Sequence, residues 1–160
     1  MSNMFLDSSV IFLDMEENSK EAVLRTMVSN LKEKNLVKDT YLDAVIEREQ
    51  EFATGLPTAG YAVAIPHTDV EHVNRKTISV AVLKEPVDFG VMGTPDETTM
   101  VKIVFLLAMD EANTQLSLLQ SLMQVFQDED TLSFLANEKD KEKIVGLLAD
   151  KLDISVEGGE

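Results

Sequence analysis

Val101-Lys-Ile-Val-Phe-Leu-Leu-Ala-Met109 is the most apolar stretch of the chain, with one charge in nine residues. Turn-forming residues lie close to it on both sides, at 93–96 and at 110–113. A run this short between turn signals fits a strand covered on both faces better than a helix. The stretch therefore predicts a sheet that is buried on both sides.

Four further stretches have the composition of strands. Residues 77–83 (Thr-Ile-Ser-Val-Ala-Val-Leu) predict a central strand, and residues 87–90 predict a separate short edge strand. Residues 61–65, bounded by a glycine and a proline, predict a short buried strand. Residues 10–13 form an apolar run that predicts a strand or an extended entry segment.

Between these stretches, apolar residues recur at intervals of three and four, which is the period of an amphipathic helix. Asn18 and Glu21 resemble a capping box, and Asp39, Asp130 and Asp140 can each cap a first turn. The expected helices cover about residues 18–35, 39–53, 114–126, 130–135 and 140–152.

Strands separated by helical stretches, and apolar on both faces, indicate an α/β fold. A length of 160 residues suits one domain. We expect that domain to span residues 1–154, with a mixed parallel and antiparallel sheet of about five strands flanked by helices on both faces. Residues 155–160, which end in Glu-Gly-Gly-Glu, are expected to form a disordered tail.

Charge narrows the classes of partner. The chain has 29 acidic and 14 basic residues and a formal net charge of −15, which repels nucleic acid and anionic lipid. No apolar run approaches the roughly 18 residues that span a bilayer, and the N-terminus lacks a basic signal-like flank, so a cytoplasmic protein is expected. The absence of cysteine excludes disulfides and thiolate chemistry, which leaves two histidines as candidate nucleophiles or ligands.

His67 is the first candidate for chemistry, because Ile65-Pro66-His67-Thr68 fixes an imidazole just after a strand. Loops at strand ends are where open α/β sheets place their sites. Neutral imidazole is a good nucleophile near neutral pH, and the nitrogen–phosphorus bond that it forms stays labile. A histidine here can also simply hydrogen-bond a turn, and the pattern alone leaves both uses open.

His72 follows five residues later and can share a pocket with His67 if the segment turns back. As an imidazolium it could hydrogen-bond phosphoryl oxygens, and otherwise it is a surface histidine beside Glu71. A metal site completed by Asp69 or Glu71 is a weaker alternative, since the i, i+5 spacing does not align two ligands on a helix.

Arg48 is the basic residue best placed on the short route into the strand at 61–65. An arginine can direct two hydrogen bonds onto phosphate oxygens, which a lysine cannot match. The alternative is an exposed helix arginine paired with a neighbouring glutamate. No nucleotide-binding glycine loop and no Gly-x-Ser-x-Gly motif is present, so neither an ATP donor nor a hydrolase is supported.

Three segments together resemble a known family: Arg48-Glu49, Thr54-Gly55-Leu56-Pro57 and Ala62-Val-Ala-Ile-Pro-His67. They are similar to the fructose/mannitol-type enzyme IIA (type-2 EIIA) of the phosphoenolpyruvate:sugar phosphotransferase system, and the resemblance covers nearly the whole chain. It implies a mixed sheet with helices on its faces, a phosphorylated His67 and an active-site role for Arg48. No cofactor is implied.

The same resemblance implies the partners. The donor would be the phosphorylated carrier protein HPr and the acceptor a cysteine of enzyme IIB, with the membrane involved only through enzyme IIC. Many family members carry a second histidine where this chain has Gln115, whose amide can still donate a hydrogen bond to phosphate. Gln115 together with His72 looks more like the galactitol-specific branch. A regulatory member, in which phosphorylation of His67 controls a protein partner, is the alternative.

Overall fold

The computed structural model describes residues 3–157, and side chains from residue 4 to residue 154. Its helices are α1 (Lys20–Glu33), α2 (Tyr41–Glu51), α3 (Ala112–Phe126), α4 (Glu129–Asn137) and α5 (Lys141–Leu152), with short 3-10 helices η1 (Ser8–Val10) and η2 (Val70–His72). Its strands are β1 (Asn3–Phe5), β2 (Ile11–Met15), β3 (Gly55–Leu56), β4 (Ala62–Ala64), β5 (Thr77–Gly90), β6 (Thr98–Ala108) and β7 (Ser155–Glu157).

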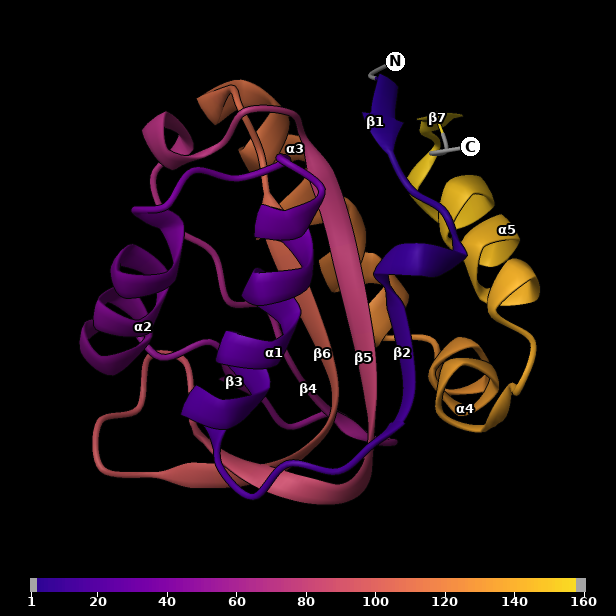
Figure 1. Cartoon of the computed structure of the whole chain (residues 1–160). Coiled ribbons are helices and arrows are strands. Elements are labelled where there is room, and N and C mark those ends of the chain that lie inside the picture. The colour runs from indigo at the N-terminus through magenta and orange to yellow at the C-terminus, as the bar shows by residue number, and fades with distance from the viewer. Residues whose placement is uncertain (1–2, 158–160) are drawn as a thin grey trace.

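The strands form one mixed sheet in the order β3-β4-β6-β5-β1-β7, with β2 also paired to β5. Helices α1 and α2 lie on one side of the sheet and α3, α4 and α5 on the other (Figure 1). The expected α/β class, mixed pairing and helices on both faces are confirmed. The described residues form seven strands rather than about five, because β1, β3 and β7 are only two or three residues long and carry little periodic signal.

The antiparallel pair of β5 and β6 is the centre of the sheet, with register running from Thr77↔Ala108 to Gly90↔Thr98. The prediction of two strands in the β5 region is wrong, because the structure has one continuous strand. The register shifts between Val82 and Val87, where the three residues 84–86 are exposed. A proline within that stretch lacks an N–H, so the strand tolerates it at an irregularity and continues beyond it.

The short strand β3 is held close to the far end of β5. Gly55 pairs with Ala64 of β4, and a Cβ atom placed on Gly55 would lie 2.5 Å from the carbonyl oxygen of Gly90. Only glycine fits this approach. The chain that leaves α2 is therefore fixed to the sheet directly before β4.

Three of the predicted helix caps are shifted along the sequence. The hydroxyl of Ser19, rather than Asn18, accepts the Ala22 N–H at 3.1 Å, because Ser19 is the extended residue directly before the first turn. The N-caps of α2 and α4 are likewise Thr40 rather than Asp39 and Asp128 rather than Asp130. Asp140 caps α5 as predicted.

The two ends of the described chain lie side by side (Figure 1). Ser155–Glu157 pairs in parallel with β1, whereas the sequence predicted a disordered tail from residue 155. The difference has a physical reason: β1 would otherwise leave its outer edge unpaired, and three extended residues are enough to cover it. Residues 158–160 of the predicted tail lie outside the described residues.

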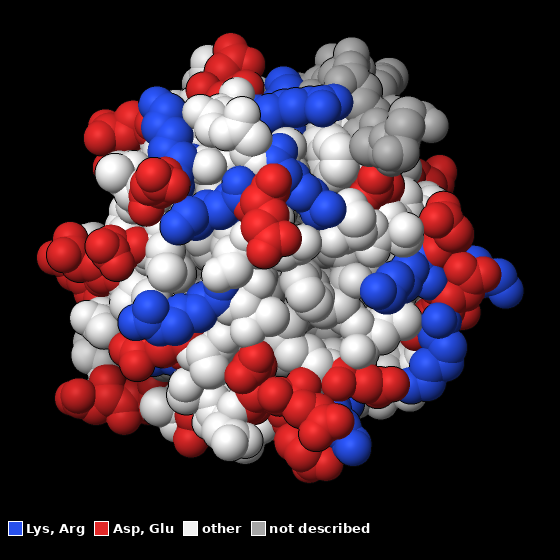
Figure 2. All heavy atoms as spheres, in the orientation of Figure 1, with Lys and Arg blue, Asp and Glu red and all other residues white. Residues whose placement is uncertain are grey.

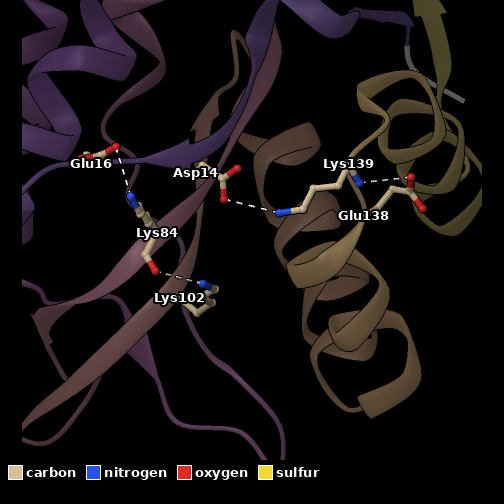
Figure 3. Close-up of polar contacts among 6 residues, drawn as sticks. All are labelled: Asp14, Glu16, Lys84, Lys102, Glu138 and Lys139. Atoms are coloured by element: carbon tan, nitrogen blue, oxygen red, sulfur yellow. Dashed lines mark hydrogen bonds and ion pairs between the residues drawn. The ribbon is translucent and has the colours of Figure 1, made fainter.

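Exposed ion pairs link β2 to its neighbours (Figure 3). Lys139 Nζ lies 3.5 Å from Asp14 Oδ1, and Lys84 Nζ lies 3.6 Å from Glu16 Oε2. All four side chains are more than half exposed, so each pair contributes little to stability. On the face in Figure 2, Lys and Arg side chains are interspersed with Asp and Glu and form no continuous basic surface. Within residues 3–157, no helix has the length and apolar character that a bilayer crossing needs.

Candidate functional site

His67 follows β4 by three residues, at the edge of the sheet where the parallel strands β4 and β6 both end. The backbone there is anchored, because the Leu107 N–H donates to the Pro66 carbonyl at 3.0 Å. His67 is buried, with 9% of the residue exposed, and its Nε2 is not among the fully enclosed polar atoms that lack a partner. The predicted position at a strand exit is confirmed.

The two ring nitrogens of His67 have different surroundings. Nδ1 lies 2.8 Å from the carbonyl oxygen of Ile65. Because a carbonyl can only accept, Nδ1 carries the proton, and Nε2 keeps its lone pair. Within the described residues Nε2 has no hydrogen-bond partner. The ring therefore presents a free nucleophilic nitrogen.

Burial lowers the pKa of His67, and the nearby positive charge of Arg48 lowers it further. The hydrogen bond to Ile65 and the negative charge of Asp69 act in the opposite direction without reversing the shift. The imidazole is therefore neutral at neutral pH, which is the form that can attack phosphorus.

Arg48 lies in the last turn of α2, close enough to His67 to affect its pKa. Its guanidinium stacks on the ring of Phe52, with Cζ 5.2 Å from the ring centroid. Its Nε atom is buried and has no hydrogen-bond partner among the described residues. A buried donor without an acceptor is costly, and phosphate oxygens are suitable acceptors for it. The structure thus places Arg48 close enough to His67 for its charge to act on the imidazole.

Gln115 lies in the first turn of α3, which begins four residues after β6 ends. The helix starts from the sheet edge at which His67 is placed. The Oε1 atom of Gln115 is buried without a partner among the described residues, so its amide has unused hydrogen-bonding capacity. No hydrogen bond joins Gln115 to His67 in the described part of the chain, and its role stays a prediction.

His72 lies in η2, and both of its ring nitrogens face other residues. Nδ1 is 2.8 Å from Thr40 Oγ1, and Nε2 is 3.8 Å from Glu71 Oε2. Thr40 is the N-cap of α2, whereas Arg48 lies in the last turn of the same helix. The structure therefore places His72 at the opposite end of α2 from Arg48. No described contact joins it to His67, so its part in the chemistry also stays a prediction.

Glu49 and Thr54 are part of the site although sequence reasoning gave them no role. Both are 3% exposed, and the Glu49 carboxylate accepts the Thr54 N–H and the Thr54 hydroxyl, each at 2.8 Å. Burial raises the pKa of Glu49, while the two hydrogen bonds and the charges of Lys20 and Arg48 oppose the shift. The sequence contains a signal that Glu49 is buried: it follows Tyr41 and Val45 at intervals of four, on the buried face of α2.

Two further features of the described residues bear on the site: possible metal ligands and a hollow beside α2. No group of three or more His, Cys, Asp or Glu side chains suited to a metal ion occurs among the described residues. A hollow of about 600 Å³ is lined by residues 49–53 at the end of α2 and 90–98 of the β5–β6 hairpin, together with Lys20. His67 is not part of its wall.

Comparison with known proteins gives a family match and related sequences. Residues 4–151 match the family described as "Phosphoenolpyruvate-dependent sugar phosphotransferase system, EIIA 2". The chain is 31% identical to the galactitol-specific EIIA component of the Escherichia coli K12 phosphotransferase system, over 84% of this chain and 86% of that protein.

Solved structures show the same fold. The crystal structure of the mannitol IIA of Escherichia coli aligns with a TM-score of 0.71 and 26% identity, covering 90% of this chain and 99% of that one. The complex of mannitol enzyme IIA with phosphorylated enzyme IIB from Escherichia coli gives 0.71 at 23% identity, over 94% and 98% of the two chains. The nitrogen regulatory protein IIA-Ntr of Neisseria meningitidis gives 0.71 at 25%, over 90% and 96%.

Proposed function

Because the chain belongs to the EIIA type 2 family of the phosphoenolpyruvate-dependent sugar phosphotransferase system, we propose that it carries a phosphoryl group on His67 between two protein partners. The observation that carries this proposal is the state of the ring: Nδ1 is engaged by the Ile65 carbonyl, and Nε2 is free. The imidazole is also kept neutral by burial, as a nucleophile requires.

In the first step, the Nε2 lone pair of His67 attacks the phosphorus of the phosphorylated donor. A nitrogen–phosphorus bond forms on His67, the bond between phosphorus and the donor breaks, and the donor keeps that electron pair. The Nδ1 proton stays on the ring throughout. In the second step an acceptor thiolate attacks phosphorus from the other side, and Nε2 regains its lone pair.

The protein contributes position and charge to both steps. In-line phosphoryl transfer develops charge on the equatorial oxygens, which preorganised donors stabilise. The Arg48 guanidinium, with its unpaired Nε, supplies the positive charge. The further donor is the NH2 group of the Gln115 amide. Thr40 occupies the Nδ1 atom of His72, so any contribution from this ring is made by Nε2.

The proposed partners are those that the family resemblance implies. The donor is phosphorylated HPr, and the acceptor is a cysteine of enzyme IIB. The chain is linked to the membrane only indirectly, through enzyme IIC. The transfer then takes place on the cytoplasmic side. The solved complex of a mannitol IIA with phosphorylated IIB supports the acceptor. The galactitol-specific relative supports galactitol or a similar polyol as the sugar.

A direct test uses the purified chain with phosphoenolpyruvate, enzyme I and HPr. Intact mass spectrometry should show one added phosphoryl group, labile in acid and stable in base, and His67→Ala should accept none. Labelling of His67→Ala at His72 would reassign the site. A panel of IIB domains then identifies the acceptor, with the galactitol-specific IIB expected to be the fastest.

A regulatory role is the second candidate, favoured by the similarity to the nitrogen regulatory IIA-Ntr. In that case His67 would still be phosphorylated, but no IIB domain would remove the phosphoryl group. Transfer to any IIB of the panel at a rate comparable to the donor step would exclude a purely regulatory chain.

A further inference from the structure

We propose that Glu49 and Thr54 are positioning residues which set the tautomer of His67 and so direct the phosphoryl group to Nε2. This inference rests on the proposed function for its consequence, but the tautomer itself can be measured without any phosphoryl transfer. It assigns a task to two buried polar side chains that have no described contact with the reacting nitrogen.

The first link joins Glu49 to Thr54. Both carboxylate oxygens of Glu49 are used, one by the Thr54 N–H and the other by the Thr54 hydroxyl, each at 2.8 Å. A buried carboxylate is expensive unless such bonds hold it. With the hydroxyl proton committed to Glu49, the lone pairs of the Thr54 oxygen can only accept. The carboxylate therefore orients the threonine hydroxyl.

The second link joins Thr54 to the chain that carries His67. The Ile65 N–H donates to Thr54 Oγ1 at 3.2 Å, and the Ile65 carbonyl accepts the His67 Nδ1–H at 2.8 Å. On the other side of that carbonyl, the Leu107 N–H holds the Pro66 carbonyl at 3.0 Å. The acceptor for Nδ1–H is thus fixed from both sides, by Thr54 and by β6.

The arrangement also ties the nucleophile to its cation. Glu49 follows Arg48 directly on α2, so the turn of helix that places the guanidinium also places the carboxylate that orders Thr54. Histidine tautomers are set by the hydrogen bond that one ring nitrogen makes. Loss of the Thr54 hydroxyl would free the Ile65 N–H and loosen the carbonyl that accepts from Nδ1. The tautomer protonated on Nε2 would then become populated, and in that tautomer Nε2 has no lone pair with which to attack phosphorus.

The test compares Thr54→Val, which keeps the shape but loses the hydroxyl, with Thr54→Ser, which keeps the hydroxyl. Glu49→Gln forms a third variant, since its NH2 group can only donate and would replace one of the two oxygens that accept from Thr54. The readout is the tautomer of His67 from the ¹⁵N shifts of the two ring nitrogens in protein with ¹⁵N-labelled histidine. Signals are assigned by comparison with His67→Asn, and folding is checked by cooperative thermal unfolding.

Wild type and Thr54→Ser should show Nδ1–H as the dominant form and should be phosphorylated on Nε2. Thr54→Val and Glu49→Gln should show a mixture with Nε2–H and transfer at least about 10-fold more slowly, since a small misplacement of a reacting group can cost about 100-fold. Thr54→Ser should stay within about 2-fold of wild type.

A merely structural role predicts something different: lower stability in Thr54→Val with unchanged ring nitrogen shifts. That result, or an Nε2–H tautomer in wild type, overturns the proposal. If Thr54→Val does not fold, Glu49→Gln decides by the same shifts. If the tautomers change as expected but His67 accepts no phosphoryl group in wild type, the positioning role stands and the proposed function fails.

Discussion

The guanidinium of Arg48 stacks over the ring of Phe52, one helical turn later, with Cζ 5.2 Å from the ring centroid. The contact holds the guanidinium where its charge lowers the pKa of His67. The Nε atom of Arg48 has no hydrogen-bond partner in the described part of the chain. Phe52 is 55% exposed and Arg48 is half-buried, so the stacked pair lies at the surface with the Arg48 Nε turned inward.

Replacement of Arg48 by alanine should slow phosphoryl transfer to His67 by about 100-fold, the scale of losing one preorganised donor at a developing charge. Arg48→Lys should recover only part of this, since an ammonium cannot offer two parallel donors. Single-turnover phosphorylation by phosphorylated HPr measures both. Arg25→Ala, which removes an exposed arginine from α1, is the matched control and should transfer at the wild-type rate. An unchanged rate in Arg48→Ala would make Arg48 a surface residue.

Gln115→Ala should reduce the transfer rate by about 10-fold, because a neutral donor contributes less than a charged one. The matched control is Gln120→Ala, on an exposed position of the same helix. Equal rates for the two variants would remove Gln115 from the site. Gln115→His is informative in addition: restoring the residue that many family members carry should leave transfer close to wild type if the position serves the phosphoryl group.

The pH dependence of the reaction follows from the lowered pKa of His67. In the unfolded chain histidine titrates near about 6.5, so between that value and the lower folded pKa the unfolded state binds more protons. Two results are expected as pH falls through this window. The transfer rate stays near its maximum because the ring stays neutral, and the free energy of unfolding decreases.

Single-turnover rates and urea unfolding are measured from pH 8 downward. At each pH, the free energy of unfolding is compared with that of His67→Asn. Subtracting the variant removes the contributions of other groups that titrate. A difference in unfolding free energy that grew in favour of wild type at lower pH would contradict the direction of the shift.

Tyr41 gives a prediction about stability alone. Its hydroxyl, fully buried, donates to the Leu107 carbonyl at 2.5 Å, and burial raises the pKa of the phenol far above its ordinary value. Tyr41→Phe should lower the free energy of unfolding by about 1 to 2 kcal/mol. Tyr61→Phe, at a side chain that is 37% exposed, should change it by less than about 0.5 kcal/mol. Urea unfolding of both variants distinguishes them.

Sequence patterns identified the long elements because their periodicity is strong. Residues 101–109 predicted β6, and the spacing of leucines from residue 114 predicted α3. They did not identify β3, where a close approach to Gly90 rather than composition decides the structure. They also divided β5 into two pieces, since an interior proline normally ends a strand and only the partner strand shows that it does not.

The candidate site was likewise only partly predictable from the sequence. His67 was identifiable because a proline and a strand end define its position locally. Its distinct nitrogens were not, because the Ile65 carbonyl reaches Nδ1 only in the folded turn. The sequence left open whether His72 shares the pocket of His67, because its partner Thr40 is 32 residues away, at the other end of α2 from Arg48. Long-range contacts of this kind leave no local pattern.

Helix α2 is secured at both ends to the strands that flank His67: its Tyr41 hydroxyl reaches the end of β6, and its Glu49 carboxylate reaches Thr54 just before β3. The surface around His67 is therefore preformed and has little freedom to adapt to a partner. Under the proposed function, donor and acceptor proteins bind this one rigid surface in succession. Selection between them then rests on shape complementarity and on which protein carries the phosphoryl group.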